Sequence, residues 1–566
     1  MKLVVVGGVA GGASAAARVR RLDAKAEVIM IERGEHVSFS NCCLPYHLSE
    51  TVANSESLVL MNPTKFKKSH NIEARVNSEV IDIKRAEKKV VVKDLLKNEI
   101  YEESYDKLVL APGANPILPK SITGIDKEHV FSIRNVSDIR KIKAYIDNPT
   151  VENIVVVGGG FIGVETAENL KEAGKNVSLI EGTNQIMAPF DYDMVQILHK
   201  ELDDHGVNLY VSSTLKAIEE DYVIAVKNEK EFEIKADAVI MAIGVAPETT
   251  LAEKAGLEIG ETRGIKVNQH YQTSDPDIYA VGDAIESFNA LTHKAGRLAL
   301  AGPAQRQAHA AADHMYGIHH NNKGFIGSSC IRVFNQNAAS TGLSEKSAIA
   351  NGYSCDSVMI FPTDKVGLMP GSNYMAFKLV FEVPTGRILG AQAIGKGNVD
   401  KRIDVIATMI TMHGTLEDLK ELELCYSPVF STAKDVVNVA AMVALNVLYG
   451  KFKQVHVDEV RSLVENNAYI VDVREEREFA NGHLNGAHNV PLSQLEERMH
   501  EIPKDVPVYL HCRSSQRSYY AICRLQGNGY TNVYNMSGSY LGFSLYEYFN
   551  DKSEGRTPIM DKYNFK

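Results

Sequence analysis

The chain has 566 residues, of which 45% are hydrophobic and 23% are charged, and its formal net charge is −10. That length suits roughly three to four globular domains, and the composition is that of ordinary folded domains. The acidic balance comes without a block of Lys and Arg, so a nucleic-acid surface is not expected. Small soluble molecules are the expected substrates.

The first segment, "MKLVVVGGVAGGASAAARVRR", has a lysine, an apolar run and an alanine-rich end, so a signal peptide is one alternative. However, four glycines interrupt the run after a stretch of only strand length. We expect the glycines to bring a pyrophosphate to the N-terminus of the following helix. Glu32 closes the next strand about 20 residues further on, where an acid can hydrogen-bond a ribose hydroxyl. The glycines are Gly7, Gly8, Gly11 and Gly12.

A second glycine-rich turn, "NIVVVGGGFIGVETAENL", places Gly158, Gly160 and Gly163 in strict G-x-G-x-x-G register. "NVSLIEG" then brings Glu181 to the end of the next strand. An acid at that position repels a 2′-phosphate, which favours NADH over NADPH. The alternative is a degenerate fold that binds no nucleotide.

A third segment, "TSDPDIYAVGDA", predicts a strand followed by a turn that carries Gly282 and Asp283. It follows "AIGVAPET" (242–249), and "LAPGANP" (110–116) comes earlier. Two nested dinucleotide folds with these connections resemble the flavin-dependent pyridine nucleotide disulfide oxidoreductases. The resemblance implies FAD in the first fold, NAD(P)H in the second, and Asp283 near the flavin ribityl or phosphate region. It also assigns cofactor contacts to Arg33, Ala111 and Gly244.

The chain has seven cysteines, with neither a C-x-x-C pair nor the spacing of a zinc site. We therefore expect free thiols in a reducing, cytoplasmic compartment, and no metal site. Cys42 and Cys43 are adjacent in "SFSNCCLPYHL". Adjacent cysteines rarely bridge each other, because their Cβ vectors point apart.

The same stretch resembles the single-cysteine branch of the family, whose motif runs S-F-x-N-C-G-L-P-Y. That branch includes coenzyme A disulfide reductase, NADH-dependent persulfide reductases, NADH oxidases and NADH peroxidases. The resemblance makes Cys42 the redox cysteine that meets the flavin, and its thiolate the group that attacks sulfur. The alternative is an inert buried thiol. Cys43 either fills the usual small-residue slot or acts as a second sulfur carrier or soft-metal ligand. The matching residues are Ser38, Phe39, Asn41, Cys42, Leu44, Pro45 and Tyr46.

Other positions distinguish the members of this branch. Peroxidases carry a histidine in the first glycine-rich turn, which here reads Val9-Ala10-Gly11, so an acid/base group for peroxide is missing. A coenzyme A substrate is favoured, since arginines suit a nucleotide with several phosphates. A solvated helix face is the alternative reading of the same residues. The resemblance assigns coenzyme A contacts to Ser14, Arg18, Arg21, Ser38, Asn41 and Arg306.

The segments "GNVDKRIDVI" and "CYSPVFSTAKDVVN" resemble further parts of coenzyme A disulfide reductase. In that enzyme two tyrosines of the partner subunit approach the redox cysteine, which implies a homodimer. Tyr426 matches the later tyrosine and Lys434 matches a substrate-contacting lysine. Leu368, in "LMPG", stands where the earlier tyrosine is expected.

In the C-terminal segment "VPVYLHCRSSQRSYYA" a strand delivers Cys512 into a six-residue loop that is closed by Arg517 and a helix. This region resembles a single rhodanese domain. Loop amides and the helix N-terminus stabilise a thiolate or persulfide on Cys512, and Arg517 helps to order the anion-binding loop. Ser515 replaces the usual glycine. The alternative is an inactive rhodanese used for docking.

We therefore predict an α/β chain with two nested Rossmann-like domains, an α+β dimerisation domain and an α/β rhodanese domain. The expected activity is NADH- and FAD-dependent reduction of coenzyme A persulfide, polysulfide or disulfide. An NADH oxidase that uses a cysteine sulfenic acid is the alternative. The apolar stretch 436–449 is too short for a membrane span and predicts a buried or interface helix. The predicted domains are 1–115 with 246–322 (FAD), 116–245 (NAD), 323–450 (dimerisation) and 451–566 (rhodanese).

Overall fold

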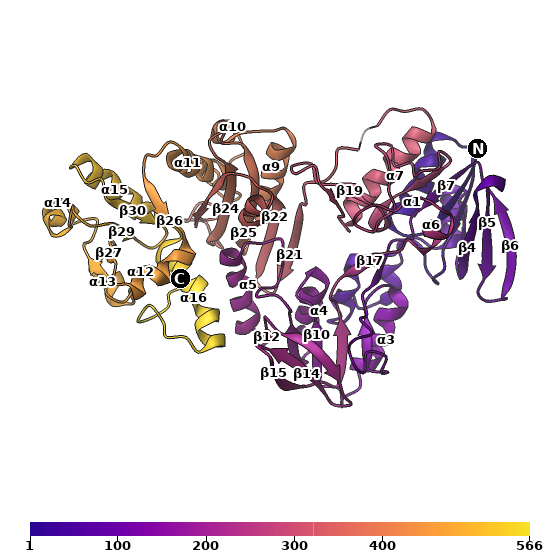
Figure 1. Ribbon diagram of the computed structural model, residues 1–566, viewed down its shortest axis with the longest axis horizontal. Coiled ribbons are helices and arrows are strands. Elements are labelled where there is room, and N and C mark those ends of the chain that lie inside the picture. Colours follow the sequence, from indigo (N-terminus) through magenta and orange to yellow (C-terminus); the bar gives the residue numbers. More distant parts are fainter. Residues whose placement is uncertain (321, 566) are drawn as a thin grey trace. The chain divides into compact units, whose positions relative to one another are not determined.

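The structure is a computed structural model that describes residues 1–320 and 322–565. It divides into two compact units, one made of Met1–Asn184 and Tyr210–Phe325 and the other of Gln185–Leu209 and Ile326–Lys566. Figure 1 labels their helices and strands along the chain.

The first unit begins with a parallel sheet in the order β18-β7-β1-β2-β3. Its strands are short and apolar, as expected for a sheet covered on both faces, and four of the five residues of β1 are buried. Helices α1 and α7 pack against each other beside this sheet. The strands are β1 (Lys2–Val6), β2 (Glu27–Ile31), β3 (Glu73–Arg75), β7 (Lys107–Leu110) and β18 (Ile278–Ala280).

The remaining elements of this first nucleotide-type fold are two small sheets and several helices. An antiparallel sheet is formed by β4 (Ser78–Lys84), β5 (Lys89–Asp94) and β6 (Glu99–Ser104), and a small ribbon by β19 (Ser287–Phe288) and β20 (Ala295–Gly296). The α-helices are α1 (Ala10–Leu22), α2 (Pro63–His70), α6 (Thr250–Lys254) and α7 (Ala301–Met315). The 3-10 helices are η1 (Asn41–Cys43), η2 (Pro45–His47), η3 (Ser55–Leu58), η4 (Arg85–Glu87) and η5 (Gly282–Ala284).

A second nucleotide-type fold is inserted into the first. The chain leaves along β8 (Ala114–Pro116) and returns along β17 (Val245–Pro247), and these two strands pair antiparallel. Between them lies a sheet in the order β12-β11-β10-β16-β9, with a separate three-stranded sheet β13-β14-β15. The elements are β9 (Val130–Ser132), α3 (Val136–Ile146), β10 (Asn153–Val157), α4 (Phe161–Glu172), β11 (Asn176–Ile180), β12 (Asn208–Tyr210), β13 (Thr214–Ile218), β14 (Tyr222–Lys227), β15 (Lys230–Lys235) and β16 (Ala238–Met241).

The second unit contains a central domain built on an antiparallel sheet in the order β21-β22-β25-β24-β23. Every residue of β25 is buried, because helices cover the sheet. Helix α5 (Tyr192–Asp204) also belongs to this unit. The remaining elements are β21 (Ser329–Val333), β22 (Gln336–Gly342), α8 (Glu345–Ala350), β23 (Cys355–Ile360), β24 (Met375–Glu382), β25 (Ile388–Gly395), α9 (Val399–Thr411), α10 (Leu416–Glu421) and α11 (Val436–Leu448).

The C-terminal domain of the same unit has a parallel sheet in the order β26-β30-β29-β27-β28. Its two faces bury separate apolar clusters, one against α15 and one against α12 and α16. The elements are β26 (Lys453–Val455), η6 (Val457–Glu459), α12 (Val460–Glu465), β27 (Tyr469–Asp472), α13 (Glu476–Ala480), β28 (His488–Asn489), α14 (Leu495–Arg498), η7 (Met499–Glu501), β29 (Val508–His511), α15 (Gln516–Gly527), β30 (Val533–Met536) and α16 (Ser539–Glu554).

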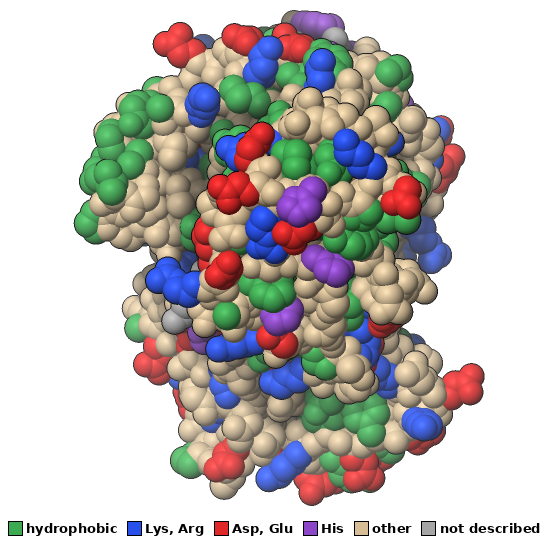
Figure 2. Space-filling model, turned by 90° about the vertical axis from the view of Figure 1, so that its left-hand side faces the viewer, with side chains coloured by type: hydrophobic (Ala, Val, Ile, Leu, Met, Phe, Trp, Pro, Cys, Tyr) green, Lys and Arg blue, Asp and Glu red, His purple; other side chains and the backbone are tan. Residues whose placement is uncertain are grey.

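The predicted α/β architecture, with nested folds followed by two further domains, is confirmed. The apolar stretch from Val436 forms α11, most of which is buried against its own domain. Within 1–320 and 322–565, no helix is both long and apolar enough to cross a membrane. On the face drawn in Figure 2, basic and acidic side chains are interspersed among small groups of hydrophobic ones.

Candidate redox and sulfur-transfer sites

The first glycine-rich turn is built by close approach of backbone. Gly7 has φ +94°, and a Cβ on it would lie 2.1 Å from the carbonyl oxygen of Ala111. A Cβ on Gly12 would lie 1.8 Å from the Gly7 carbonyl oxygen, so α1 begins hard against the end of β1. Only glycine fits at either position. The Glu32 carboxylate closes the turn by accepting the N–H groups of Gly8 and Gly34, both at 2.8 Å.

A cavity of about 440 Å³ opens at the carboxyl ends of β1 and β2, where nucleotides bind in such sheets. The bare turn and the acid beside it suit the pyrophosphate and ribose of FAD. Arg33 also lines the cavity, and its guanidinium donates to the Asn115 amide oxygen at 3.0 Å. The other lining residues include Val6, Gly7, Ile31, Glu32, Ser78, Val80, Pro112 and Glu248.

The second glycine-rich turn repeats the construction of the first. Gly158 has φ +110°, and a Cβ on Gly163 would lie 1.8 Å from the Gly158 carbonyl oxygen. Gly160 precedes the first residue of α4. The Glu181 carboxylate accepts the N–H of Gly159 at 2.7 Å, as Glu32 does in the first turn. This repetition supports a second dinucleotide site.

Asp283 lies in η5, directly after β18. The Gly282 N–H donates to the Gln307 side chain at 2.8 Å, which fixes this turn against α7. Burial raises the pKa of the Asp283 carboxyl, and the positive charge of Arg134 partly opposes this shift. Sequence reasoning missed Arg134, because no motif links these two residues.

The segment that carries Cys42 is anchored to both nucleotide-type folds. The Ser38 N–H donates to the Gly8 carbonyl at 2.7 Å, which ties the segment to the first glycine turn. Further along, the Ser49 hydroxyl donates to the Asn169 amide oxygen of α4 at 2.6 Å. Cys42 lies between these anchors, in η1, and its side chain is exposed.

The protein around Cys42 disfavours its thiolate. Although the side chain is exposed, partial loss of water around the sulfur raises the pKa of the Cys42 thiol most, followed by the charges of Glu165, Cys43 and Asp283. These residues therefore work against the thiolate character expected from the motif.

Glu165 was missed by sequence reasoning. It lies in α4, two residues after Gly163, and burial raises its pKa to about 7. An acid inside the helix that follows a glycine-rich turn was the signal that could have found it. A group with this pKa changes its charge near neutral pH and can therefore hold or release a proton there.

The expected coenzyme A residues of α1 share one side of that helix, because Ser14, Arg18 and Arg21 are spaced by four and three positions. This side borders α7: Arg18 pairs with Asp313 at 2.6 Å, and Arg21 lies 3.4 Å from the ring of His309. Arg306 is exposed on α7, so these residues occupy two adjacent helices. Asn41 is exposed beside Cys42.

In the second unit, a buried arginine joins the two segments that carry the expected partner-facing residues. Arg402 donates to the Asp364 carbonyl at 2.8 Å and pairs with the Asp435 carboxylate at 3.2 Å. The first segment continues to Leu368, whose side chain is 92% exposed. The second carries the exposed residues Tyr426, Val429, Phe430 and Lys434.

The C-terminal domain presents Cys512 at the end of β29. The sulfur is covered, and the side chain is 1% exposed. The loop is shorter than predicted, because Ser515 takes a left-handed conformation (φ +71°) and α15 begins at Gln516. Arg517 thus belongs to the first turn of the helix and does not lie at the end of the loop.

Arg517 forms a two-fold ion pair with Glu478, at 2.6 and 2.8 Å. The bonds to Glu478 hold the pKa of Arg517 above its ordinary value and that of Glu478 below it. The Ser518 hydroxyl lies 3.8 Å from the Cys512 sulfur. Sequence reasoning missed Glu478, which is 39 positions away and belongs to α13.

The residues Asp472-Val473-Arg474, at the end of β27, are buried near this loop. Asp472 and Arg474 are buried and paired at 2.6 Å, and the Arg474 guanidinium lies 4.0 Å from the centre of the Tyr540 ring. Burial lowers the pKa of His511, the residue before Cys512, so its imidazole is neutral at pH 7. These buried residues therefore support the strand that leads into the loop.

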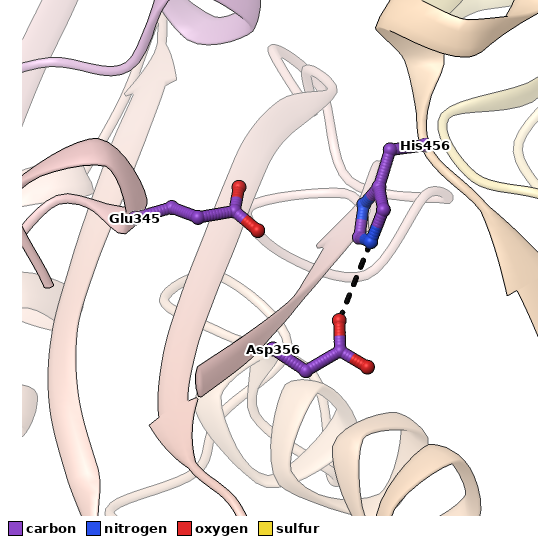
Figure 3. A group of neighbouring side chains, drawn as sticks. All are labelled: Glu345, Asp356 and His456. Carbon is purple, nitrogen blue, oxygen red and sulfur yellow. Dashed lines mark ion pairs between the residues drawn. The ribbon is translucent and has the colours of Figure 1, made fainter. Parts of the chain in front are cut away.

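A cluster of three side chains joins the central and C-terminal domains of the second unit (Figure 3). One ligand atom each from Glu345, Asp356 and His456 lies within 4.8 Å of the others, a donor set that could hold a divalent metal ion. However, Lys378 pairs with Glu345 at 2.7 Å, and the His456 Nε2 lies 3.3 Å from Asp356 Oδ1. These contacts join the side chains in an ion-pair network.

Comparison with known proteins gives the family of each part. The pyridine nucleotide-disulphide oxidoreductase family matches residues 1–308, its dimerisation domain matches 329–436, and the rhodanese-like domain matches 456–545. The chain is 32% identical over 443 residues to coenzyme A disulfide reductase of Staphylococcus haemolyticus, which covers 77% of this chain and 98% of that protein.

Two solved structures span nearly the whole chain. Reduced Bacillus anthracis CoADR-RHD is 42% identical with a TM-score of 0.93, covering 96% of this chain and 98% of that one. The NAD-dependent persulfide reductase from A. fulgidus is 33% identical with a TM-score of 0.90, covering 96% and 100%. The nested nucleotide folds, the single cysteine segment between them and these matches agree. The chain therefore belongs to the pyridine nucleotide-disulphide oxidoreductase family, as an FAD- and NAD-dependent oxidoreductase that carries a rhodanese-like domain.

Proposed function

We propose that this enzyme uses NADH and FAD to reduce coenzyme A persulfide, polysulfide or disulfide at Cys42, and that its rhodanese domain transfers sulfur through Cys512. The observation that carries the proposal is the placement of Cys42: an exposed thiol on a segment anchored to both nucleotide folds. The relatives described above support the substrate class. The domain boundaries are proposed as predicted from the sequence.

In the proposed reaction, Cys42 attacks one sulfur of the substrate. The substrate S–S bond breaks, a new S–S bond to Cys42 forms, and coenzyme A thiolate or hydrosulfide leaves. Bound FAD supplies the electron pair from NADH that reduces the bond on Cys42. The residues of the first turn, with Glu32, Arg33, Ala111, Gly244 and Asp283, would hold FAD, and the second turn with Glu181 would hold NADH.

Protons must reach the departing thiolate and leave Cys42. Glu165 lies close enough for its charge to raise the pKa of Cys42, and its own pKa of about 7 suits a proton carrier at neutral pH. We assign this role to it. The arginines of α1 and α7 would bind the phosphates of coenzyme A, with Ser14, Ser38, Asn41 and Lys434 as further contacts.

We further propose that the working enzyme is a homodimer. The dimerisation-domain match supports it, and so does the exposed apolar group of Leu368, Tyr426, Val429 and Phe430. A second subunit would cover this group and could bring Tyr426 to the redox cysteine.

Turnover of coenzyme A persulfide by the holoenzyme, compared with turnover of oxygen alone, tests the proposal. We expect persulfide to be reduced faster, with hydrosulfide as a product. Cys42→Ser should still bind FAD, and NADH should still reduce this FAD. The variant should not reduce the sulfur substrates, because serine cannot form the mixed disulfide. A mutant that still reduces persulfide would move the chemistry to Cys43, and Cys43→Ser is the matched control.

An NADH oxidase is the second candidate, because the chain is 27% identical to the water-forming NADH oxidase from Lactobacillus brevis, with a TM-score of 0.75 over 80% of this chain. In that reaction Cys42 would cycle through sulfenic acid. A dominant rate with oxygen alone would favour this candidate and refute the reductase.

A further inference from the structure

The loop that carries Cys512 is in contact with a residue from outside the rhodanese domain. The guanidinium carbon of Arg513 lies 4.4 Å from the centre of the Tyr374 ring, which is within cation–π range. Arg513 directly follows Cys512. Tyr374 precedes β24 of the central domain and lies well before residue 456, where the rhodanese match begins.

The same loop is also hydrogen-bonded to the first turn of α16. The N–H groups of Tyr540 and Leu541 donate to the carbonyls of Cys512 and Arg513, both at 3.1 Å. The Cys512 N–H donates to the Ser539 hydroxyl at 3.2 Å. Every backbone group in these bonds belongs to α16 or to the loop, so movement of α16 would move Cys512.

The first turn of α16 in turn packs on the central domain. A Cβ added at Gly542 would lie 3.4 Å from the Phe361 ring, and one at Gly538 would lie 3.5 Å from the Met359 sulfur. Both distances are ordinary van der Waals contacts, so this turn lies against side chains of the central domain. The central domain thus reaches the sulfur loop directly through Tyr374 and indirectly through α16.

We propose that Tyr374 is a positioning residue for sulfur transfer: its ring holds the Arg513 guanidinium beside Cys512, where this charge helps to bind an anionic sulfur donor. The proposal rests on the proposed sulfurtransferase role of Cys512. An aromatic face fixes a guanidinium without cancelling its charge.

The reaction that tests this role is transfer from thiosulfate to cyanide. The Cys512 thiolate attacks the outer sulfur of thiosulfate, a Cys512 persulfide forms, and sulfite leaves with the electron pair of the broken S–S bond. Cyanide then takes the outer sulfur as thiocyanate and restores the thiolate. No oxidant or reductant is consumed. The dianionic donor meets the loop in the first step, so weakened positioning of Arg513 should appear in the KM for thiosulfate.

We expect Tyr374→Ala and Tyr374→Leu in the full holoenzyme to raise the KM for thiosulfate about three- to tenfold, with kcat changed less than about twofold. Tyr374→Phe keeps the ring face and should stay close to native. In an Arg513→Gln background, Tyr374→Ala should have no further effect. Tyr353→Ala is the matched control, because Tyr353 lies under Arg387 in the same domain, at 5.5 Å.

A native KM in both Tyr374→Ala and Tyr374→Leu would overturn the inference. So would an equal loss in Tyr353→Ala, or a further loss from Tyr374→Ala in the Arg513→Gln background, since each would indicate a general structural effect. A native chain that transfers no sulfur would refute the sulfurtransferase proposal and this one with it. An active native chain with unaffected Tyr374 variants would refute this inference alone.

Discussion

At the scale of single residues, the pKa of Cys42, the proposed redox cysteine, depends on neighbours from both nucleotide folds. Ionised Glu165 raises the pKa of Cys42 by like-charge repulsion. Because the Glu165 pKa is about 7, this repulsion is weak at pH 6 and strong at pH 8. Proton release from Glu165 and thiolate formation on Cys42 therefore oppose each other across neutral pH.

Glu165→Gln removes that charge at every pH. We expect the Cys42 pKa to fall, which speeds alkylation by iodoacetamide about threefold at pH 8. The control is Glu172→Gln, the same change at an exposed position of α4. Mass spectrometry of the peptide that holds Cys42 measures the rate. An unchanged alkylation rate in Glu165→Gln would contradict the effect of the Glu165 charge on Cys42. Loss of the reduction of coenzyme A disulfide or persulfide in the same variant would support the role of Glu165 as a proton carrier.

Glu181 is the residue that we expect to set the choice between NADH and NADPH. Its carboxylate lies at the turn, 2.7 Å from the Gly159 N–H, where it can pair with a ribose hydroxyl and repel a 2′-phosphate. The native enzyme should prefer NADH. Glu181→Ser should narrow the ratio of kcat/KM for NADH over NADPH by about tenfold. Equal efficiency of the native enzyme with both cofactors would remove this role from Glu181.

At the scale of elements, the segment around Leu368 and the segment around Tyr426 are held together by one buried arginine. Arg402 binds both, and Leu368 stands where the resemblance places the earlier tyrosine. Under the proposed function, protonation of a departing coenzyme A thiolate would then depend on Tyr426, whereas hydrosulfide is a better leaving group and needs less help.

Tyr426→Phe should therefore slow reduction of coenzyme A disulfide about a hundredfold and persulfide reduction only about threefold. Leu368→Tyr should restore part of the disulfide activity. Steady-state assays on the two substrates measure both effects, with Tyr449→Phe, another exposed tyrosine of the same domain, as control. Equal losses on the two substrates would show that Tyr426 orients coenzyme A and donates no proton.

The junction between the central and C-terminal domains should respond to pH. Burial opposes a positive charge on His456, but Asp356 and Glu345 outweigh burial and the nearby Lys378, so the His456 pKa is raised. The charged imidazole therefore stabilises the junction fully below the unfolded pKa of about 6.5. This contribution is lost as pH rises through the folded pKa.

We expect the exposed residues 449–451, between α11 and β26, to be cleaved more readily by a protease at pH 8.5 than at pH 6. His456→Gln should remove most of that difference, because glutamine carries no charge at either pH. His500→Gln, at an exposed position of the same domain, is the control. Equal cleavage of the native chain at the two pH values would refute the contribution of His456.

At the scale of the whole molecule, the sequence predicts the features that depend on short motifs, namely the glycine-rich turns and the two cysteine sites. The glycines at 7, 12, 158 and 163 could be recognised because backbone atoms approach to distances that no side chain allows. Cys42 and Cys512 could be placed because short motifs surround them.

The surroundings of those groups could not be predicted. The charges of Arg134 and Glu165 reach Asp283 and Cys42 from far along the chain, and the partners of Arg517 and Arg513 are common residues in other elements. No spacing rule connects them. The pKa of Cys42 consequently went against the expectation from its motif, since it depends on residues that only the folded chain brings near.

The paired strands β8 and β17 place the exit and the return of the inserted fold side by side, with Asn115 opposite Ala246. Neighbouring strands lie about 5 Å apart, so the whole stretch between them is a loop whose two ends almost touch. A gene segment with such ends can be gained, lost or exchanged without separating the strands of its host sheet. The β8–β17 pair therefore allows the inserted fold to be added to the FAD-binding fold as a single piece. The same two strands are the positions at which a nucleotide-binding domain of different cofactor preference could be inserted.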